Sequence, residues 1–139
     1  MHGITTSASL LALLGYASWT LALLVLIAVH RAALVVGGRR PNSFSPWGAD
    51  VSPFSERLCR AHANCIENLP VFAGFVVVAT LAGARHVTDP LALWVLAARI
   101  AQSTVHLLST TNRAVMLRFA LLAGQVLVMM TWLLEFAFW

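Results

Sequence analysis

With 139 residues, of which 60% are hydrophobic and only 10% charged, the chain has too little charge to cover the surface of a soluble domain, which carries about 25% charged residues. Its net charge of +4 is the balance of nine arginines and five acidic residues, and the arginines are scattered along apolar sequence, which excludes the contiguous basic face of a nucleic-acid-binding protein. We therefore expect an integral membrane protein, and because one span takes about 20 apolar residues, the length allows about four spans with short loops.

The first predicted element is an apolar helix over residues 8–36, whose uncharged part is too long for the core of a signal peptide. Ser7 or Ser9 is the expected N-cap, because either hydroxyl can accept a hydrogen bond from a free backbone N–H of the first turn. The pair Gly37–Gly38 is expected to end the helix. The residues that follow, 39–55, are rich in Ser, Pro, Gly and Asp and predict the one substantial loop of the chain.

Three further spans are predicted over residues 57–83, 90–110 and 114–138. Each of them takes charged side chains to membrane or interface depth, and Arg99 lies close to the middle of the third span. Short turns separate these spans. The chain is therefore predicted to have an all-α integral membrane fold, a bundle of four transmembrane helices that forms a single domain over residues 1–139.

Arginines near the span ends predict the orientation of the chain, because loops with more arginine stay in the cytoplasm. Most arginines flank the first and third loops, whereas Arg85 alone occupies the second loop and the termini carry none. We therefore expect the first and third loops in the cytoplasm and both termini outside. Within the last span, Arg118 and Trp132 are expected as anchors at the membrane interface.

Two rows of polar side chains are the most informative feature of the spans, because an ionisable group at a helix centre costs at least about 2.5–3.5 kcal/mol and usually marks a site. Helical spacing places one row on a single face of the second span: Arg57, Arg60, Asn64 and Glu67. The same spacing gives a row on the third span, which a further turn extends to Arg113: Arg99, Gln102, His106 and Ser109. Both rows lead toward the cytoplasmic side, where we expect them to meet.

The excess of positive charge in these rows predicts an anionic ligand. The alternative is that Arg60 or Arg99 simply neutralises Glu67 and ties the bundle together. His62 lies away from the row of the second span and is either a ligand residue or a contact between subunits. The histidines and cysteines form no cluster with the spacing of a metal site, so we expect no metal.

Residues 56–72 contain the pattern R-A-x-x-N-x-x-E-x-x-P-x-F, which begins at Arg60. This segment resembles the signature of the MAPEG family, the membrane-associated proteins of eicosanoid and glutathione metabolism, and all fixed positions match. The four-span layout fits the family along essentially the whole chain. The resemblance implies a homotrimer of four-helix protomers, with glutathione bound between neighbouring subunits near the cytoplasmic side.

The resemblance also implies a role for individual residues. The residues that it implies around glutathione come from the first three spans and their loop: Arg39, Arg60, His62, Asn64, Glu67, Arg99 and Gln102. Arg113 is implied beside the glutathione sulfur, where a guanidinium stabilises the thiolate and lowers the pKa of the thiol. His106 is the rival for the catalytic role, as a general base.

The chain departs from the family on its third span. Where many members have His or Tyr followed four residues later by Tyr, this chain has Gln102 and His106, and its only tyrosine is Tyr16. We expect a protein of the bacterial inner membrane that uses glutathione as a cosubstrate, a transferase or peroxidase acting on hydrophobic small-molecule or lipid electrophiles among the membrane lipids. The alternative is a noncatalytic trimeric membrane scaffold that binds lipid or glutathione. A small anion transporter is disfavoured, because the chain has no internal repeat.

Overall fold

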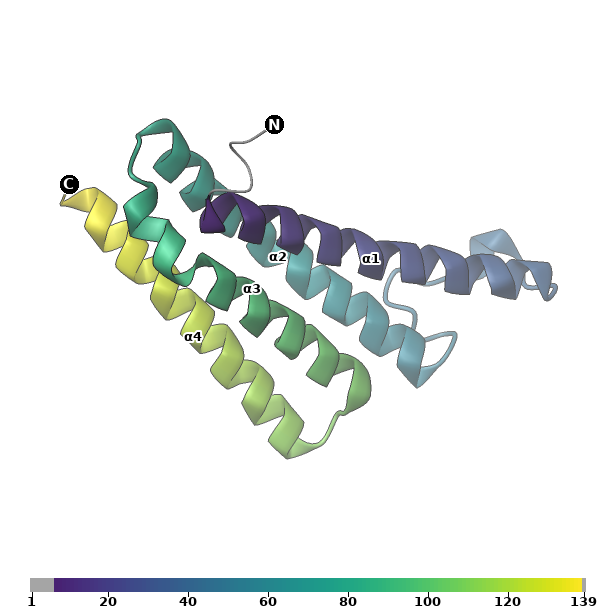
Figure 1. The fold of residues 1–139 in the computed structure, drawn as a ribbon. Coiled ribbons are helices and arrows are strands. Elements are labelled where there is room, and N and C mark those ends of the chain that lie inside the picture. The colour runs from purple at the N-terminus through teal and green to yellow at the C-terminus, as the bar shows by residue number, and fades with distance from the viewer. Residues whose placement is uncertain (1–6, 139) are drawn as a thin grey trace.

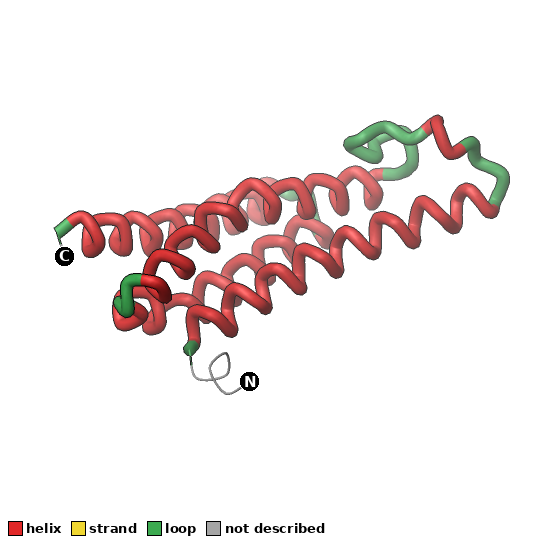
Figure 2. Tube along the Cα trace, turned by 90° about the horizontal axis from the view of Figure 1, so that it is seen from above, coloured by secondary structure: helices red, strands yellow, loops and turns green. Residues whose placement is uncertain are grey.

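The computed structural model describes residues 7–138, and this part of the chain is helical apart from its loops. Four long helices follow one another in alternating directions, and a short 3-10 turn lies in the first loop (Figure 1). Their bounds are α1 (Ala8–Val36), η1 (Pro41–Ser43), α2 (Pro53–Leu81), α3 (Arg85–Leu108) and α4 (Asn112–Ala137). The start of α1 and the end of α4 lie at one end of the bundle, and the first and third loops lie at the other (Figure 1). Figure 2 shows the first loop at the far end of α1.

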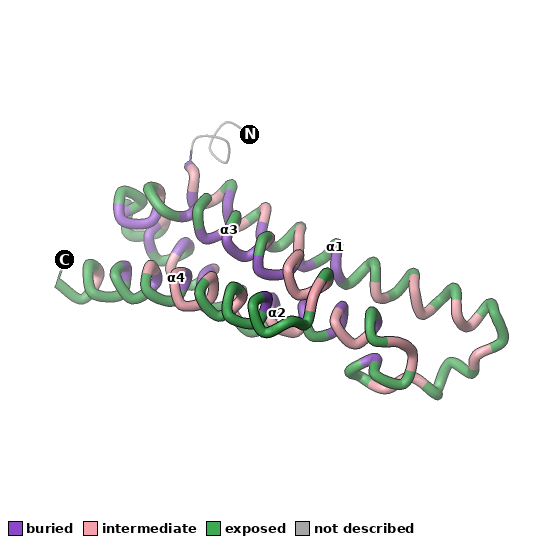
Figure 3. Tube along the Cα trace, turned by 90° about the horizontal axis from the view of Figure 1, so that it is seen from below, coloured by how far each residue is buried: buried purple, intermediate pink, exposed green. Residues whose placement is uncertain are grey.

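The outer surface of the bundle is mostly apolar. Each of the four helices is long and apolar enough to cross a membrane. Buried positions are confined to the inner faces of the helices, and exposed positions cover the outer faces (Figure 3). The exposed positions include large side chains such as Leu21, Leu127 and Phe119, which are 59%, 66% and 65% exposed. Such a surface suits lipid as its solvent, so the chain is an integral membrane protein.

The starts of α2 and α3 differ from the predicted spans, whereas α1 coincides with the predicted span 8–36. α2 begins at Pro53, because Ser52 accepts a hydrogen bond from the backbone N–H of Ser55 and proline suits the first helical position. α3 begins before Pro90, which lies inside the helix. A proline this close to the helix start removes a single backbone hydrogen bond and leaves the remainder of the helix intact.

The start of α1 is tied to the start of α3. Ser7 is the N-cap of α1, one of the two alternatives that the sequence predicts. Oδ1 of Asp89 accepts hydrogen bonds from the Ser7 hydroxyl at 3.0 Å, the Ser9 backbone N–H at 2.9 Å and the Ser9 hydroxyl at 2.6 Å. The Ser9 and Thr88 hydroxyls also form a buried hydrogen bond of 2.7 Å. One carboxylate thus satisfies donors of the first turn of α1 from a neighbouring helix.

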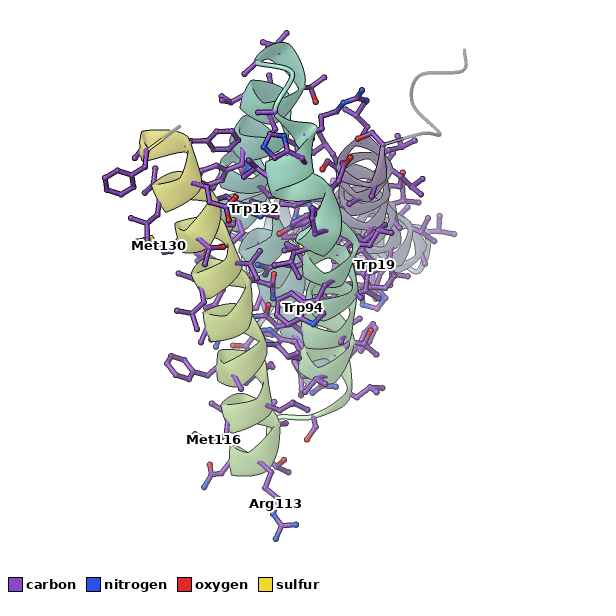
Figure 4. The ribbon with its side chains drawn as sticks, turned by 60° about the vertical axis from the view of Figure 1, so that its left-hand side comes forward. Trp19, Trp94, Arg113, Met116, Met130 and Trp132 are labelled. Atoms are coloured by element: carbon purple, nitrogen blue, oxygen red, sulfur yellow. The ribbon has the colours of Figure 1, made fainter. Side chains whose placement is uncertain are left out.

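Aromatic side chains fill the centre of the bundle. The ring centroid of Trp132 lies 6.0 Å from that of Phe72 and 6.0 Å from that of Phe75, and Tyr16 lies 5.5 Å from Phe72. Trp132 is only 1% exposed, so its predicted position at the membrane interface is wrong. The helical spacing from Met129 explains the difference, because both residues are buried and three residues apart on one face of α4. Figure 4 shows Trp132 on the inner side of this helix.

Candidate functional site

A polar cavity of about 530 Å³ lies between α2, α3 and α4, at the end of the bundle that carries the third loop. Its volume falls in the range of about 300–1,000 Å³ that is usual for small-molecule sites. We call it the arginine cavity. Its walls combine charged and amide side chains with apolar residues of α4: Pro53, Glu56, Arg57, Arg60, Asn64, Gln102, His106, Thr110, Val115, Arg118, Phe119 and Leu122.

The start of α2 supplies two arginines and one carboxylate to the arginine cavity. Nε of Arg57 donates a hydrogen bond of 2.9 Å to the backbone oxygen of Leu107, a carbonyl at the end of α3 that has no partner within its own helix. Nη2 of Arg60 lies 2.6 Å from Oε1 of Glu56, one helical turn away. Arg60 therefore pairs with Glu56, whereas Glu67 is exposed on α2 and lies outside the cavity.

The opposite wall of the arginine cavity comes from α3 and α4. Gln102 and His106 lie one turn apart on α3, and Arg118 and Phe119 come from α4. The structure places Arg118 in the cavity instead of at an outer anchor position. The sequence of α4 gives no signal for this position, because Arg118 has no polar neighbour at helical spacing that lines the cavity with it.

Arg99 lies behind the arginine cavity and is only 1% exposed. Its Nη1 donates to the Asn64 side-chain oxygen at 3.2 Å and to the Asn64 backbone oxygen at 3.4 Å. The guanidinium carbon lies 5.5 Å from the centroid of the Tyr16 ring. Within residues 7–138, Nε and Nη2 of Arg99 have no hydrogen-bond partner. Arg99 therefore binds Asn64. Within the protomer it does not form the pair with Glu67 that the alternative predicts.

Arg113 lies outside the arginine cavity of its own protomer. It is exposed in the first turn of α4, and its side chain extends away from the bundle (Figure 4).

Of the site residues predicted from the sequence, the protomer brings four together in the arginine cavity: Arg60, Asn64, Gln102 and His106.

Arg39 is engaged within the first loop. Its guanidinium forms an ion pair with the carboxylate of Asp50 and donates to the hydroxyl of Ser43 at 3.2 Å. Partial desolvation raises the pKa of Asp50, but hydrogen bonds from the backbone N–H groups of Asp50 and Ser45 and the charge of Arg39 outweigh it. The pKa of Asp50 therefore lies below its ordinary value. These contacts make Arg39 part of a loop structure and not of the arginine cavity.

His62 lines a second, smaller cavity of about 240 Å³ between α1, α2 and the first loop, together with Arg31 and Cys59. Nη2 of Arg31 donates a hydrogen bond of 2.9 Å to the backbone oxygen of Ser45. The guanidinium carbon of Arg31 lies 5.5 Å from the ring centroid of Phe44. Arg31, and not Arg39, is thus the arginine that α1 itself brings to a cavity.

The charges of the arginine cavity are unequal. It contains three guanidiniums, from Arg57, Arg60 and Arg118, and one carboxylate, from Glu56. Arginine binds carboxylates through paired N–H donors, and the bond is stronger away from bulk water. The cavity is therefore suited to an anion that also carries hydrogen-bonding groups for Asn64 and Gln102.

One of three comparisons with known proteins gives a match. A search of curated proteins and a search of solved structures gave no match. A comparison with protein-family models matches residues 9–138 to the MAPEG family, a range that contains every residue of the arginine cavity and, apart from Ala8, all four helices. Membership fits a role in glutathione-related or eicosanoid metabolism. By this match over nearly its whole length, the chain belongs to the MAPEG family, which includes glutathione transferases and related enzymes.

Proposed function

We propose that this protein is a membrane-bound, glutathione-dependent transferase or peroxidase for hydrophobic electrophiles, with glutathione bound in the arginine cavity. The observation that carries the proposal is a cavity with three guanidiniums at one end of a bundle of apolar helices. Glutathione carries two carboxylates, one ammonium and one thiol, so its net charge opposes that of the cavity. An electrophile dissolved in lipid reaches the same place from the membrane.

The side chains of the arginine cavity complement glutathione group by group. Arg57, Arg60 and Arg118 are assigned to the two carboxylates, because a guanidinium holds a carboxylate through two parallel hydrogen bonds. Glu56 is assigned to the ammonium group. Asn64 supplies an amide for the remaining polar atoms of the tripeptide.

The chemistry starts from the thiolate of glutathione. Nearby positive charge favours the thiolate over the thiol and so lowers the pKa of the bound thiol. His106 lies in the same cavity and is assigned as the base that takes the thiol proton. The thiolate sulfur then forms a bond to the electrophilic carbon, and the leaving group departs with its electron pair. Phe119 and Leu122 form an apolar wall on which the electrophile rests.

A neighbouring copy of the chain completes the site in this proposal. Glu67 is charged and exposed in the part of α2 that crosses the membrane, where lipid contact is unfavourable. A second protomer in a homotrimer would cover it. We assign Arg31 of α1 to the glutathione site in place of Arg39, because Arg39 is already paired with Asp50.

A noncatalytic glutathione-binding scaffold is the second candidate. It is favoured by the position of Arg113, which lies outside the arginine cavity of its own protomer. It is also favoured by Tyr16, the only tyrosine of the chain, which is buried against Phe72 and does not line the cavity. Both candidates share the binding of glutathione and differ in turnover.

Two measurements on the purified protein in detergent test the proposal. Calorimetric titration should show glutathione binding that Arg60→Ala weakens, and conjugation of a chromophoric halonitroarene should separate the enzyme from the scaffold. Arg85→Ala is the matched control, because Arg85 is exposed at the start of α3, at the opposite end of the bundle. Absence of glutathione binding contradicts both candidates, and binding without conjugation favours the scaffold.

A further inference from the structure

Two amide side chains of the arginine cavity are held from behind by buried donors. The first is Gln102, which is 3% exposed and contacts Gln125, a residue of α4 that is fully buried. Nε2 of Gln125 donates to the backbone oxygen of Leu121 at 2.9 Å and to Oε1 of Gln102 at 3.1 Å. Gln125 itself does not line the cavity.

Chemistry alone fixes the orientation of this pair of amides. The carbonyl oxygen of Leu121 can only accept a hydrogen bond, so the end of the Gln125 amide beside it is the nitrogen. That nitrogen can only donate, so the atom of Gln102 that faces it is the oxygen. The nitrogen of Gln102, with its two N–H donors, remains for the cavity.

The second amide is that of Asn64, and the same reasoning applies. Its Oδ1 accepts from Nη1 of Arg99 at 3.2 Å and from Nδ2 of Asn68 at 3.3 Å. A guanidinium has no acceptor, so the end of the Asn64 amide beside Arg99 is the oxygen. Within residues 7–138, neither the side-chain nitrogen of Asn64 nor that of Gln102 has a hydrogen-bond partner.

We infer that Gln125 and Arg99 are positioning residues, which turn the N–H donors of Gln102 and Asn64 into the arginine cavity, so that its inner end takes a hydrogen-bond acceptor of the ligand. This inference rests on the proposed function, in which the acceptor is the sulfur of glutathione as the thiolate. Gln102 lies farther along α3 from the third loop than His106 and Thr110 do, and hence deeper in the bundle. Arg118 of α4 lies on the loop side of Leu122 and is left for the carboxylates.

These two donors add to the positive charge of the cavity in favouring the thiolate. A group that donates hydrogen bonds to the charged form of an acid lowers the pKa of that acid. The donors are neutral and stay in place before the ligand arrives, because Gln125 and Arg99 hold the amides by their oxygens.

Nuclear magnetic resonance tests the orientation without any ligand, because Gln102 and Gln125 are the only glutamines of the chain. With ¹⁵N-labelled glutamine, the side-chain protons of Gln102 should exchange with water and those of Gln125 should be protected. Gln125→Met should shift the side-chain signal of Gln102. Because the variant retains Gln102 as its only glutamine, it also assigns the two signals of the wild-type protein. Equal protection of the two amides in the wild-type protein overturns the inference, whether or not Gln125→Met folds.

Glutathione titration tests the consequence. Gln125→Met should weaken glutathione binding by roughly two- to tenfold, the effect of losing one neutral hydrogen bond, and should raise the pH at which thiolate absorbance appears. In a Gln102→Met background the same change should have no further effect, because Gln125 acts through Gln102. Val126→Met, at an exposed neighbouring position, is the matched control.

An additive effect of Gln125→Met and Gln102→Met, or an unchanged thiolate pH profile, means that Gln125 serves packing alone and overturns the inference. If the wild-type protein binds no glutathione, the proposed function fails, and the exchange measurement still decides the orientation of the amides.

Discussion

The two arginines at the start of α4 differ in what their side chains reach, although they are only five residues apart. Arg118 lines the arginine cavity, whereas Arg113 is exposed and extends away from the bundle (Figure 4). The proposed site therefore predicts that Arg118→Ala weakens glutathione binding by about ten- to hundredfold, since a hydrogen bond to a charged group contributes roughly 1.5–3 kcal/mol. Calorimetric titration of both alanine variants provides the comparison.

Arg118→Lys serves as the control for charge, because an ammonium keeps the positive charge but loses the planar pair of donors. It should restore part of the affinity. A larger loss in Arg113→Ala than in Arg118→Ala would contradict the assignment and return Arg113 to the position beside the sulfur, across a subunit boundary.

The Arg39–Asp50 pair predicts a pH dependence of the first loop. Because the pKa of Asp50 is lowered in the folded protein, the pair contributes fully above the ordinary aspartate pKa of about 3.9, and its contribution is lost as the pH falls through the folded value. We expect hydrogen exchange in residues 43–50 to accelerate as the pH falls through the pKa of Asp50 in the folded protein. Asp50→Asn should accelerate exchange already at neutral pH.

Asp50→Asn also provides the measurement that could contradict this prediction. If the wild-type protein and Asp50→Asn show the same exchange in this loop at neutral pH, the ion pair does not order the loop.

At the residue scale, the sequence could predict the parts of the site that follow from local spacing. The intervals on α2 and α3 indicate the faces that carry Asn64 and Gln102. They do not indicate Arg118, because α4 is apolar over most of its surface and shows no polar row. The partner of Gln102 could not be predicted either, since Gln125 lies 23 residues away and meets it only through the packing of α3 against α4.

At the element scale, the Asp89 carboxylate is the main polar connection between α1 and α3. It accepts three hydrogen bonds from Ser7 and Ser9, at the end of the bundle away from the arginine cavity. Asp89→Ala should therefore lower the free energy of unfolding by roughly 1–3 kcal/mol, because buried donors lose their partner. Thermal unfolding in detergent measures this effect.

Ser7→Ala is the matched control and should cost about 1 kcal/mol, the usual effect of losing an N-cap. Neither change should alter glutathione affinity. An Asp89→Ala protein as stable as the wild type would show that the carboxylate does not hold the two helices together.

Most of the fold could be predicted from the sequence, because span length and loop composition are local properties. α1 matches its predicted range, and Ser7 is one of its two predicted caps. The predicted starts of α2 and α3 lie too late in the chain, because the prediction assigns Pro53 to the first loop and Pro90 to the boundary of a helix. Pro53 begins α2, whereas Pro90 lies inside α3. Whether a proline begins a helix or lies inside it depends on the neighbouring cap and on contacts with other helices.

At the scale of the whole molecule, the outer surface carries an exposed carboxylate, that of Glu67, well inside the part of α2 that crosses the membrane. A charged side chain facing lipid at this depth is unfavourable, so the proposed homotrimer would bury it between copies. Native mass spectrometry of the protein in detergent should show a trimer. A dominant monomer would contradict the assembly.

The last prediction tests whether each glutathione site is shared between two copies. Arg60 lines the arginine cavity, whereas Glu67 is exposed on α2 outside it, and in the proposed trimer a ligand contacts Arg60 of one copy and Glu67 of the next. Arg60→Ala and Glu67→Gln should each weaken glutathione binding while the trimer survives. Co-expressed and purified through two tags, mixed trimers should regain strong binding, because the intact cavity of one copy meets the intact outer face of its neighbour. If every site lies within one protomer, no combination contains an intact site, and the mixed trimers should bind as weakly as either parent.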